Sequence, residues 1–238
     1  MNKAVEISGP SHAPASGNAP QQLVVLCHGV GADGQDLIGL APYFAKVLPD
    51  AMFIAPNAPE AYDMAPIGHQ WFSLDEATAE TRLAGTQSAA PMLNAFIDQN
   101  LKSLGLDDSR LALVGFSQGT MMALHVALRR EKQMAGVIGY SGALVGEGLL
   151  LSEVTSRPPV LLVHGAMDDI VPPDSLDHAA RALAMAGVTV TSEMRPNLGH
   201  GLDDRGIMIG MDFLAHVFDV PLPKPTASLQ DNTPPDVT

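Results

Sequence analysis

Short apolar runs alternate with helically spaced apolar residues along most of this chain. Six runs have the length and composition of strands: residues 23–27, 51–55, 111–114, 134–140, 159–164 and 188–194. Five stretches carry apolar residues near helical spacing: residues 36–48, 75–102, 118–130, 174–187 and 203–218. Several of the strands are almost entirely apolar, which is typical of parallel strands buried on both faces. The pattern predicts a three-layer α/β domain with a mostly parallel central sheet.

Helix ends and loops can be predicted more finely at a few places. Gly85 and Pro91 are expected to interrupt the helix of residues 75–102. Asp174 is expected to cap the helix that starts near it. Residues 59–75 are expected to form a long irregular loop and residues 142–156 a mostly apolar excursion. Long loops are uncommon in compact domains unless they have a function.

The chain has 238 residues, which is enough for one large domain with a substantial core. We expect a single domain over residues 21–220. Residues 1–20 are rich in Pro, Gly, Ser and Ala and are expected to form a flexible segment, with a candidate edge strand at residues 4–7. Residues 221–238 are Pro-rich and polar, so a disordered tail is expected there.

The charge balance argues against two classes of partner. The sequence has 26 acidic and 13 basic residues, a net charge of −13. Nucleic acids and anionic membranes both attract clustered Lys and Arg, so we expect no nucleic-acid binding and no electrostatic docking on such membranes. No apolar window approaches the length of a membrane span, so no stable membrane insertion is expected either. Cys27 is the one cysteine, which excludes an intrachain disulfide and is compatible with a reducing compartment. No signal-peptide pattern is visible, and the sequence therefore predicts a soluble, cytoplasmic protein.

The strongest chemical signal is Ser117, in the motif Gly115-Phe116-Ser117-Gln118-Gly119. The motif G-x-S-x-G follows a predicted strand and precedes a predicted helix, the context of a nucleophilic serine on a tight turn. An ordinary turn that closes a β-α unit is the alternative. A serine hydroxyl is a weak nucleophile at neutral pH and needs a base, most often a histidine that a carboxylate orients.

Residues after the later strands offer that base and that carboxylate. His200 lies on a Gly-flanked loop after the last predicted strand, and His69, in the long loop, is its one serious rival among eight histidines. Asp168 and Asp169 both follow the strand of residues 159–164, and position alone does not separate them. The order serine, aspartate, histidine is the order of the α/β-hydrolase arrangement.

An acyl intermediate also needs backbone N–H groups to hold its oxyanion. One should belong to Gln118, at the start of the helix after the serine. The other should come from the glycine-rich loop after residues 23–27, where Val30 is the best candidate. A phosphate cradle or a plain turn is the alternative for this loop, but it has neither the spacing nor the lysine of a P-loop. No His, Cys or carboxylate cluster has metal-ligand spacing, so no metal site is expected.

These segments together resemble the phospholipase/carboxylesterase family of small α/β-hydrolases, which includes bacterial carboxylesterases and acyl-protein thioesterases. The matching segments are HGVGADG (28–34), QWF (70–72), GFSQG (115–119), HGAMDDIVP (164–172) and GH (199–200). They spread over nearly the whole predicted domain. The resemblance implies an α/β-hydrolase fold, and no insertion between the predicted strands is long enough for a large lid domain.

The resemblance also implies roles for individual residues. It assigns the catalytic aspartate to Asp168 and the oxyanion N–H groups to Val30 and Gln118. It places Trp71 at the border of the acyl pocket, with Gly29 and Phe72 as further candidates for substrate binding. No metal or organic cofactor is implied.

The sequence thus predicts a serine carboxylesterase that acts on short-to-medium-chain esters, with Ser117, Asp168 and His200 as its catalytic residues. An acyl-protein thioesterase or a lysophospholipase is the alternative within the same chemistry. A non-catalytic binding module on the same fold is the alternative from another class. The expected partner is a small-molecule ester, and the apolar stretch 142–156 is also a candidate homodimer interface.

Overall fold

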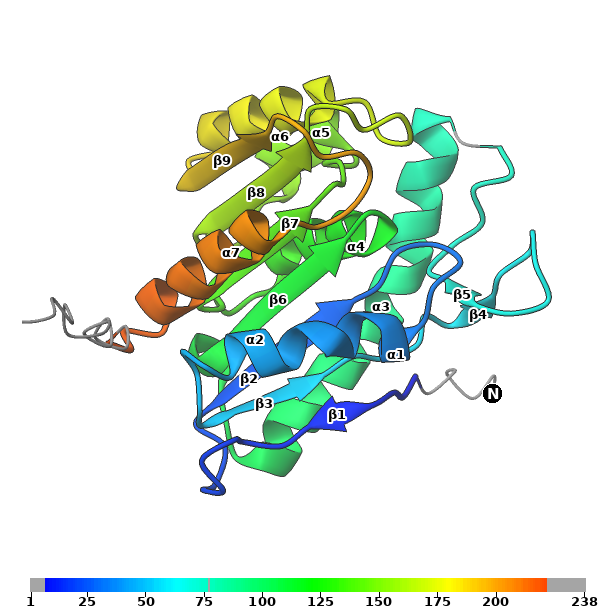
Figure 1. Cartoon of the computed structure of the whole chain (residues 1–238). Helices are drawn as coiled ribbons and strands as arrows, with labels where there is room; N and C mark the ends of the chain where they lie inside the picture. Colours follow the sequence, from blue (N-terminus) through cyan, green and yellow to red (C-terminus); the bar gives the residue numbers. More distant parts are fainter. Residues whose placement is uncertain (1–6, 77, 222–238) are drawn as a thin grey trace, which may run out of the picture.

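A seven-stranded sheet forms the centre of the computed structural model, which describes residues 7–76 and 78–221 (Figure 1). The strand order is β1-β3-β2-β6-β7-β8-β9, and every neighbouring pair is parallel except β1 and β3. The strands are β1 Ser11–His12, β2 Gln22–Cys27, β3 Ala51–Ile54, β6 Leu111–Phe116, β7 Gly136–Tyr140, β8 Val160–Gly165 and β9 Val190–Arg195. The six strands that the sequence predicts are therefore confirmed.

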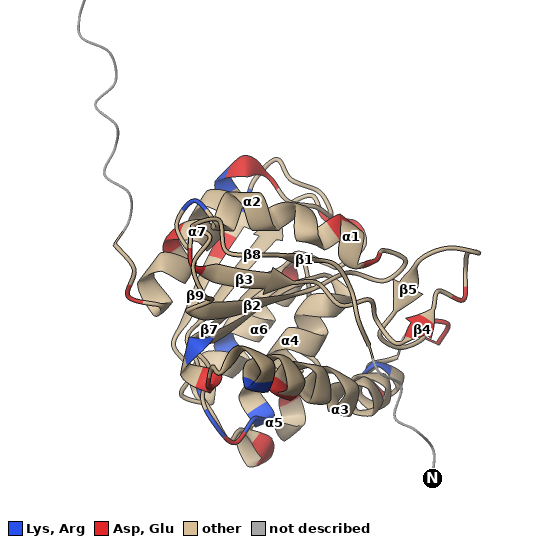
Figure 2. Cartoon of the chain, turned by 90° about the horizontal axis from the view of Figure 1, so that it is seen from below, with Lys and Arg blue, Asp and Glu red and all other residues tan. Residues whose placement is uncertain are grey.

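Helices cover both faces of this sheet, so the three-layer prediction is confirmed (Figure 2). One face packs against α3 Ala79–Leu104, α4 Gln118–Arg129, α5 Glu147–Glu153 and α6 Asp174–Met185. The other packs against α1 Gly34–Leu37, the 3₁₀ turn η1 Ile38–Leu40, α2 Ala41–Phe44 and α7 Asp204–Val217. Alternate residues of β2 serve the two cores: Leu23 and Val25 join the first, Val24 and Leu26 the second.

Helix α3 corrects the prediction that Gly85 and Pro91 interrupt it. It runs unbroken for 26 residues from Ala79 to Leu104. A side chain on residue 85 would collide with the ring of Phe72, so Gly85 lets that aromatic residue pack onto the helix. Pro91 lies on the exposed side of the helix, while Leu93 and Ile97 are fully buried and hold the helix to the sheet.

Other local predictions also differ from the structure. Asp174 is the first residue of α6, but Pro173 is its N-cap and no side chain caps this helix. Residues 36–48 form three short turns, α1, η1 and α2, because Asp33 caps a first turn and Pro42 begins a new one. The loop of residues 59–75 contains a small hairpin of β4 Glu60–Ala61 and β5 His69–Gln70.

The two ends of the chain lie partly outside the described residues. Of the candidate edge strand at residues 4–7, the structure describes Ile7, which is buried. The edge strand that it shows is β1, four residues further along, which pairs antiparallel with β3. The segment between β1 and β2 follows the same edge, with Ser16 N donating to Pro49 O at 3.0 Å. Residues 222–238, where the disordered tail is expected, lie outside the described range.

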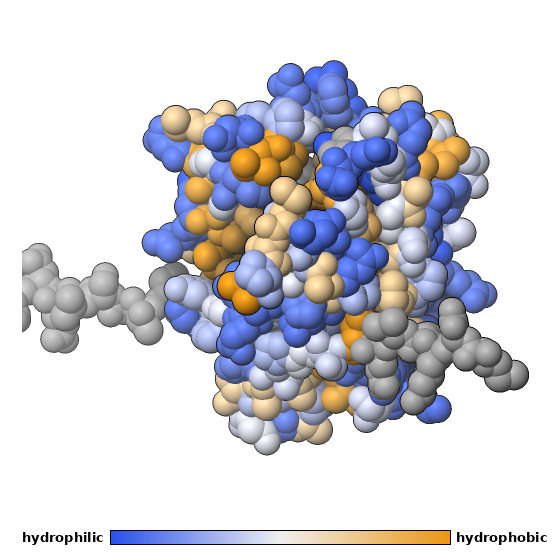
Figure 3. Space-filling model, turned by 90° about the vertical axis from the view of Figure 1, so that its right-hand side faces the viewer, coloured by the Kyte–Doolittle hydropathy of each residue, from blue (hydrophilic) through white to orange (hydrophobic). Residues whose placement is uncertain are grey.

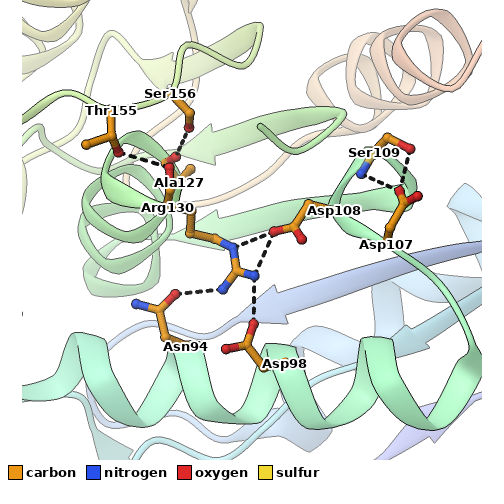
Figure 4. A network of polar contacts seen from close by, with 9 residues as sticks. All are labelled: Asn94, Asp98, Asp107, Asp108, Ser109, Ala127, Arg130, Thr155 and Ser156. Carbon is orange, nitrogen blue, oxygen red and sulfur yellow. Dashed lines mark hydrogen bonds and ion pairs between the residues drawn. The ribbon is translucent and has the colours of Figure 1, made fainter. Parts of the chain in front are cut away.

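Arg130, at the end of α4, ties that helix to α3 and to the turn before β6 (Figure 4). Its Nε and Nη2 both donate to Asp108 Oδ1, at 2.8 and 2.7 Å, and Nη2 also reaches Asp98 Oδ1 at 2.7 Å. Nη1 donates to Asn94 Oδ1 at 2.8 Å. The side chains of Arg130 and Asp108 are 9% and 11% exposed, whereas that of Asp98 is 64% exposed. The charge of Asp108 is therefore stabilised mainly by Arg130, whereas water stabilises the charge of the exposed Asp98.

We predict that Arg130→Met lowers the free energy of unfolding by about 2–4 kcal/mol, because it leaves the nearly buried Asp108 carboxylate without a partner. Asp98→Asn should change it by less than about 1 kcal/mol, because exposed ion pairs contribute little. Urea unfolding followed by circular dichroism measures both values, and the dependence of the free energy of unfolding on urea concentration should stay unchanged. Equal losses in the two variants would contradict this account of the network.

His125 is a second buried polar group on α4, and among the described residues no carboxylate forms an ion pair with it. It is 5% exposed, and its Nδ1 has no hydrogen-bond partner in the same part of the chain. Burial lowers the pKa of this imidazole to about 4, Arg129 acts in the same direction, and the weaker effect of Glu153 opposes them. The folded protein therefore keeps His125 neutral at pH values where the unfolded chain, with a histidine pKa near about 6.5, has already bound a proton.

We predict that His125 makes the protein less stable on acidification. Between pH 6.5 and 4 the unfolded state binds more protons at this residue, so the free energy of unfolding falls as pH falls, by roughly 3 kcal/mol over the whole window. His125→Leu removes the titrating group. The difference in free energy of unfolding between wild type and variant should therefore change with pH across this window and be constant above pH 7. Urea titrations at half-unit pH steps measure it, and a difference that stays constant down to pH 4 would refute the prediction.

Candidate active site

Ser117 stands on a strained turn between β6 and α4. Its backbone has φ 53° and ψ −116°, a region that non-glycine residues seldom adopt, and its N–H donates to Tyr140 O at 2.9 Å. A side chain on Gly115 would overlap the backbone of Gly119, and one on Gly119 would overlap the carbonyl group of Cys27. The two glycines therefore let strand and helix approach closely enough to force the turn, as the G-x-S-x-G motif predicts.

The structure brings Asp168 and His200 together across two loops of the same sheet edge. His200 Nδ1 lies 2.8 Å from Asp168 Oδ2, although the residues are 32 positions apart. Asp168 Oδ1 accepts the backbone N–H groups of Ile170 and Val171, at 2.9 and 2.8 Å. Asp169 is exposed, and so the contact with His200 distinguishes two residues that sequence position does not separate.

The surroundings of Asp168 favour its ionised form. Burial alone would raise the pKa of this carboxyl group, but hydrogen bonds from His200, Val171 and Ile170 outweigh burial and hold the pKa below its usual value. The side chain is fully buried. His164, which is also buried, places its Nε2 3.2 Å from Asp168 Oδ2 and 3.0 Å from Val171 O. Asp168 is thus a fixed anion that faces one nitrogen of His200.

His200 lies on the loop between β9 and α7, next to the residue before Ser117. Its ring centroid is 5.0 Å from that of Phe116. The loop is held to the neighbouring β7 edge because Ser141 Oγ donates to Gly201 O at 3.1 Å. Among the described residues no hydrogen bond joins Ser117 Oγ to His200, and Nε2 is the ring nitrogen left unpaired. Catalytic hydrogen bonds are often long in unliganded enzymes and tighten when substrate binds.

His69 occupies a different position from His200. Its Nδ1 contacts Ala58 O at 3.0 Å, and its backbone pairs with Gly31 N and Ala32 O, both at 2.8 Å. No carboxylate contacts its ring within the described part of the chain, whereas His200 has Asp168. His69 therefore supports the glycine-rich loop and lacks an orienting acid.

The glycine-rich loop after β2 lies directly beside Ser117. A methyl group placed on Gly29 would lie 3.2 Å from Ser117 Cβ and 3.1 Å from the Phe116 ring. Neither the backbone N–H of Val30 nor that of Gln118 donates a hydrogen bond within residues 7–76 and 78–221. The structure therefore leaves both predicted donors free, on the two segments that border Ser117, which suits the binding of a negatively charged oxygen.

Trp71 and Phe72 connect the glycine-rich loop to the start of α4. They are 1% and 3% exposed. The Gln118 side chain accepts the Trp71 N–H at 2.8 Å and donates to Phe72 O at 2.7 Å, while the indole of Trp71 donates to His28 O at 3.0 Å. These contacts are structural, and direct contact of Gly29, Trp71 or Phe72 with a substrate stays a prediction.

An apolar cavity of about 560 Å³ lies next to the segment that follows β7, and none of the candidate catalytic, oxyanion or substrate-contact residues lines it. Figure 3 looks onto the side toward which the parallel strands point, and shows several apolar patches separated by hydrophilic surface. The cavity is lined by Ala79, Glu80, Arg82 and Leu83 at the start of α3 and by residues 143–149. One wall of the cavity comes from the apolar excursion 142–156, which the sequence already indicates. The wall from α3 is not indicated by the sequence, because its residues fit the pattern of an ordinary helix.

The described residues offer neither a cluster of metal ligands nor a helix that could cross a membrane. No group of three or more His, Cys, Asp or Glu side chains in that part of the chain is placed to hold a metal ion. Within the same residues, no helix has both the length and the apolar character that crossing a membrane requires. Cys27 is fully buried, and burial raises the pKa of its thiol to about 12, so it is not a second nucleophile at neutral pH.

Comparison with known proteins places the chain among ester hydrolases. The model of the Phospholipase/Carboxylesterase family matches residues 12–218. Esterase YpfH of Escherichia coli strain K12 is 31% identical over 205 residues, which cover 84% of this chain and 86% of that protein. Acyl-protein thioesterase 1 of Schizosaccharomyces pombe is 29% identical over 209 residues, covering 83% of this chain and 92% of the relative.

Solved structures agree with this placement. The crystal structure of esterase PE8 superposes with a TM-score of 0.86 at 39% identity, covering 90% of this chain and all of that one. The carboxylesterase of Bacillus cereus shares the fold, with a TM-score of 0.73 at 19% identity over 90% of this chain and 96% of its own. The chain thus belongs to the phospholipase/carboxylesterase family and is a carboxylic ester hydrolase with the α/β-hydrolase fold, and residues 7–76 and 78–221 contain no large lid domain.

Proposed function

We propose that this protein is a serine carboxylesterase in which Ser117, His200 and Asp168 form a catalytic triad. Its family makes it a hydrolase of ester or thioester substrates. The observation that carries the finer proposal is the 2.8 Å contact between His200 Nδ1 and the buried Asp168, on a loop that packs against the residue before Ser117. A histidine oriented in this way is what a serine hydroxyl needs in order to react.

In the proposed mechanism His200 acts through the nitrogen that Asp168 leaves unpaired. Nε2 takes the proton of Ser117 Oγ as this oxygen attacks the ester carbonyl carbon, and it then gives the proton to the leaving alcohol. The acyl-enzyme is hydrolysed in the same way, with water in place of the serine. Asp168 stays ionised throughout and stabilises the imidazolium that forms in each half-reaction, which its lowered pKa favours.

The negative charge that develops on the carbonyl oxygen needs donors that are already in place. The N–H groups of Val30 and Gln118 make no hydrogen bond to the described residues, and they border Ser117 from two sides. Gln118 is also the first residue of α4, a helix of 12 residues whose N-terminal dipole favours an anion. We assign the oxyanion hole to these two groups, and no cofactor takes part in the reaction.

The apolar cavity supports short-to-medium acyl chains as substrates. Its wall includes Ala143, one residue after Gly142, which packs against the backbone oxygen of Ser117. A volume of about 560 Å³ accommodates an acyl group of several carbons, and apolar walls bind each methylene at about 0.8 kcal/mol. Oxygen esters are the proposed substrates. Thioesters are the second candidate, because acyl-protein thioesterases are among the relatives.

We predict that Ser117→Ala lowers kcat for p-nitrophenyl butyrate by about 10⁵-fold or more and leaves the fold intact, because removing the nucleophile of a triad has effects of this order. The variant should also fail to react with a fluorophosphonate probe. Spectrophotometric assays and intact-mass measurement test both points, with circular dichroism as the folding control. Substantial turnover by this variant would end the assignment of Ser117.

Alanine substitutions at His200 and His69 form a matched pair for the base. His200→Ala should abolish acylation, whereas His69→Ala should reduce it by a much smaller factor, since the hydrogen bonds of His69 go to the loop backbone and to Ala58 O. The pre-steady-state burst of p-nitrophenol, measured with substrate in excess over enzyme, isolates the acylation step. If His69→Ala abolished the burst and His200→Ala did not, the roles would be reversed.

We predict that Leu149→Trp, in the cavity wall, lowers kcat/KM for an octanoate ester about tenfold relative to an acetate ester, because a bulky ring occupies the space of two or so methylenes. Leu151→Trp is the control, since Leu151 belongs to the same helix but does not line the cavity. A series of p-nitrophenyl esters from acetate to palmitate measures the effect. Equal profiles for the two variants, or a wild type that prefers palmitate, would refute the cavity as an acyl site for short-to-medium chains.

A further inference from the structure

His28, at the end of β2, is a buried histidine whose two ring nitrogens are both paired. It is 1% exposed. Nε2 lies 2.9 Å from the backbone N of Ala58, and Nδ1 lies 2.7 Å from the carbonyl oxygen of Gly29. Because a backbone N–H can only donate, Nε2 must accept, and because a carbonyl oxygen can only accept, Nδ1 must carry the proton. One neutral tautomer satisfies both contacts.

The contact with Gly29 O fixes a peptide group that the reaction uses. In a trans peptide the C=O of one residue and the N–H of the next point in opposite directions. The Gly29–Val30 peptide is trans, and Gly29 O accepts both His28 Nδ1–H at 2.7 Å and Ala32 N–H at 3.3 Å. With its oxygen held on one side, this peptide must present the free N–H of Val30 on the other.

Two hydrogen bonds of Trp71 link the preceding peptide, His28–Gly29, to Gln118, the residue that carries the second proposed oxyanion donor. The backbone oxygen of His28 accepts the Trp71 indole at 3.0 Å, and the Trp71 backbone N–H donates to the side chain of Gln118 at 2.8 Å. Gln118 also carries the other free N–H. The distance between the two donors is therefore set through Trp71 and His28 as well as through the pairing of β2 with β6.

No carboxylate contacts the His28 ring within the described part of the chain, and neither ring nitrogen is left to act as a base. The ring faces His69, with centroids 6.4 Å apart, and Trp71, with centroids 5.9 Å apart. Burial, the largest effect, lowers the pKa of His28 and outweighs the hydrogen bond to Gly29 O, which raises it; His69 lowers the pKa further, and Asp33 and Asp36 raise it by smaller amounts. The neutral ring that both hydrogen bonds require is therefore the favoured one at neutral pH.

We propose that His28 is a positioning residue of the esterase reaction: its Nδ1–H holds the Gly29–Val30 peptide in the orientation that aims the Val30 N–H at the oxyanion. The inference rests on the proposed function, since it needs Ser117 as the nucleophile beside this loop. His28 touches neither substrate nor reacting atoms, and it acts by keeping one peptide from rotating. Its loss should therefore affect the transition state and leave ground-state binding almost unchanged.

Two substitutions separate the two ring contacts of His28. In His28→Asn the side-chain amide can still donate from near the place of Nδ1, but the acceptor for Ala58 N–H is lost. In His28→Gln an amide oxygen can reach the place of Nε2, but the donor to Gly29 O is lost. Both variants lose one buried hydrogen bond, so a purely structural role predicts similar effects of the two on melting temperature and on kcat.

The positioning role predicts a split between the two variants. His28→Gln should lower kcat for p-nitrophenyl butyrate about 10- to 100-fold with KM within threefold, and should weaken binding of a boronic acid, a tetrahedral mimic, by a similar factor. His28→Asn should keep kcat within about threefold of wild type. Equal kcat values for the two folded variants, or a loss confined to KM, would overturn the proposal.

Two further measurements keep the result decisive. Long-range ¹H–¹⁵N spectra of the wild-type protein should show His28 protonated on Nδ1, and protonation on Nε2 would overturn the proposal even if a variant failed to fold. The esterase activity of Ser117→Ala and the fluorophosphonate labelling of the wild type are measured in the same experiment. If Ser117→Ala stays active, the proposed function has failed. If Ser117 is labelled and essential but His28→Gln keeps full kcat, the role of His28 alone is refuted.

Discussion

The close approach of α4 to the end of β2 is the contact on which the site depends. Gly119 has no side chain to separate the helix from the carbonyl group of Cys27, and Cys27 pairs in register with Gly115 on β6. This approach forces Ser117 into its positive-φ conformation and brings the Gly29–Val30 loop against it. Backbone strain of this kind costs on the order of 1–3 kcal/mol and persists because the surrounding sheet over-determines it. The nucleophile and the proposed oxyanion donors are thus consequences of one packing constraint.

Hydrogen bonds of buried groups fix the remaining parts of the site. Asp168 receives backbone donors on one oxygen and two histidines on the other, so its charge is stabilised although water does not reach it. Gln118 and Trp71 connect the loop of residues 59–75 to the turn at Ser117. Because each of these groups would be costly to leave unpaired, the loops have little freedom to move independently. A rigid arrangement of this type is what electrostatic stabilisation of a transition state requires.

The sequence predicts much of the fold and the identity of the candidate residues, and it fails where packing overrides local preference. The six main strands and the strand–turn–helix context of Ser117 follow from apolar periodicity and a short motif. The continuity of α3 does not, because Pro91 and Gly85 are unfavourable inside an isolated helix and only the packing of Leu93, Ile97 and Phe72 explains their presence. The sequence likewise does not predict that the start of α3 lines the cavity, because residues that line a pocket have no characteristic sequence pattern.

The sequence by itself determined the three-layer α/β class, the family resemblance and the short set of chemically competent residues, because these depend on periodicity and on motifs of neighbouring residues. Only the tertiary structure decided which aspartate meets His200, that His69 faces the loop backbone, and which way the Gly29–Val30 peptide points. Asp168 and Asp169 are adjacent and chemically identical in the chain. Their difference arises from the turn after β8, which buries one carboxylate and exposes the other, and such a difference exists only once distant segments have packed together.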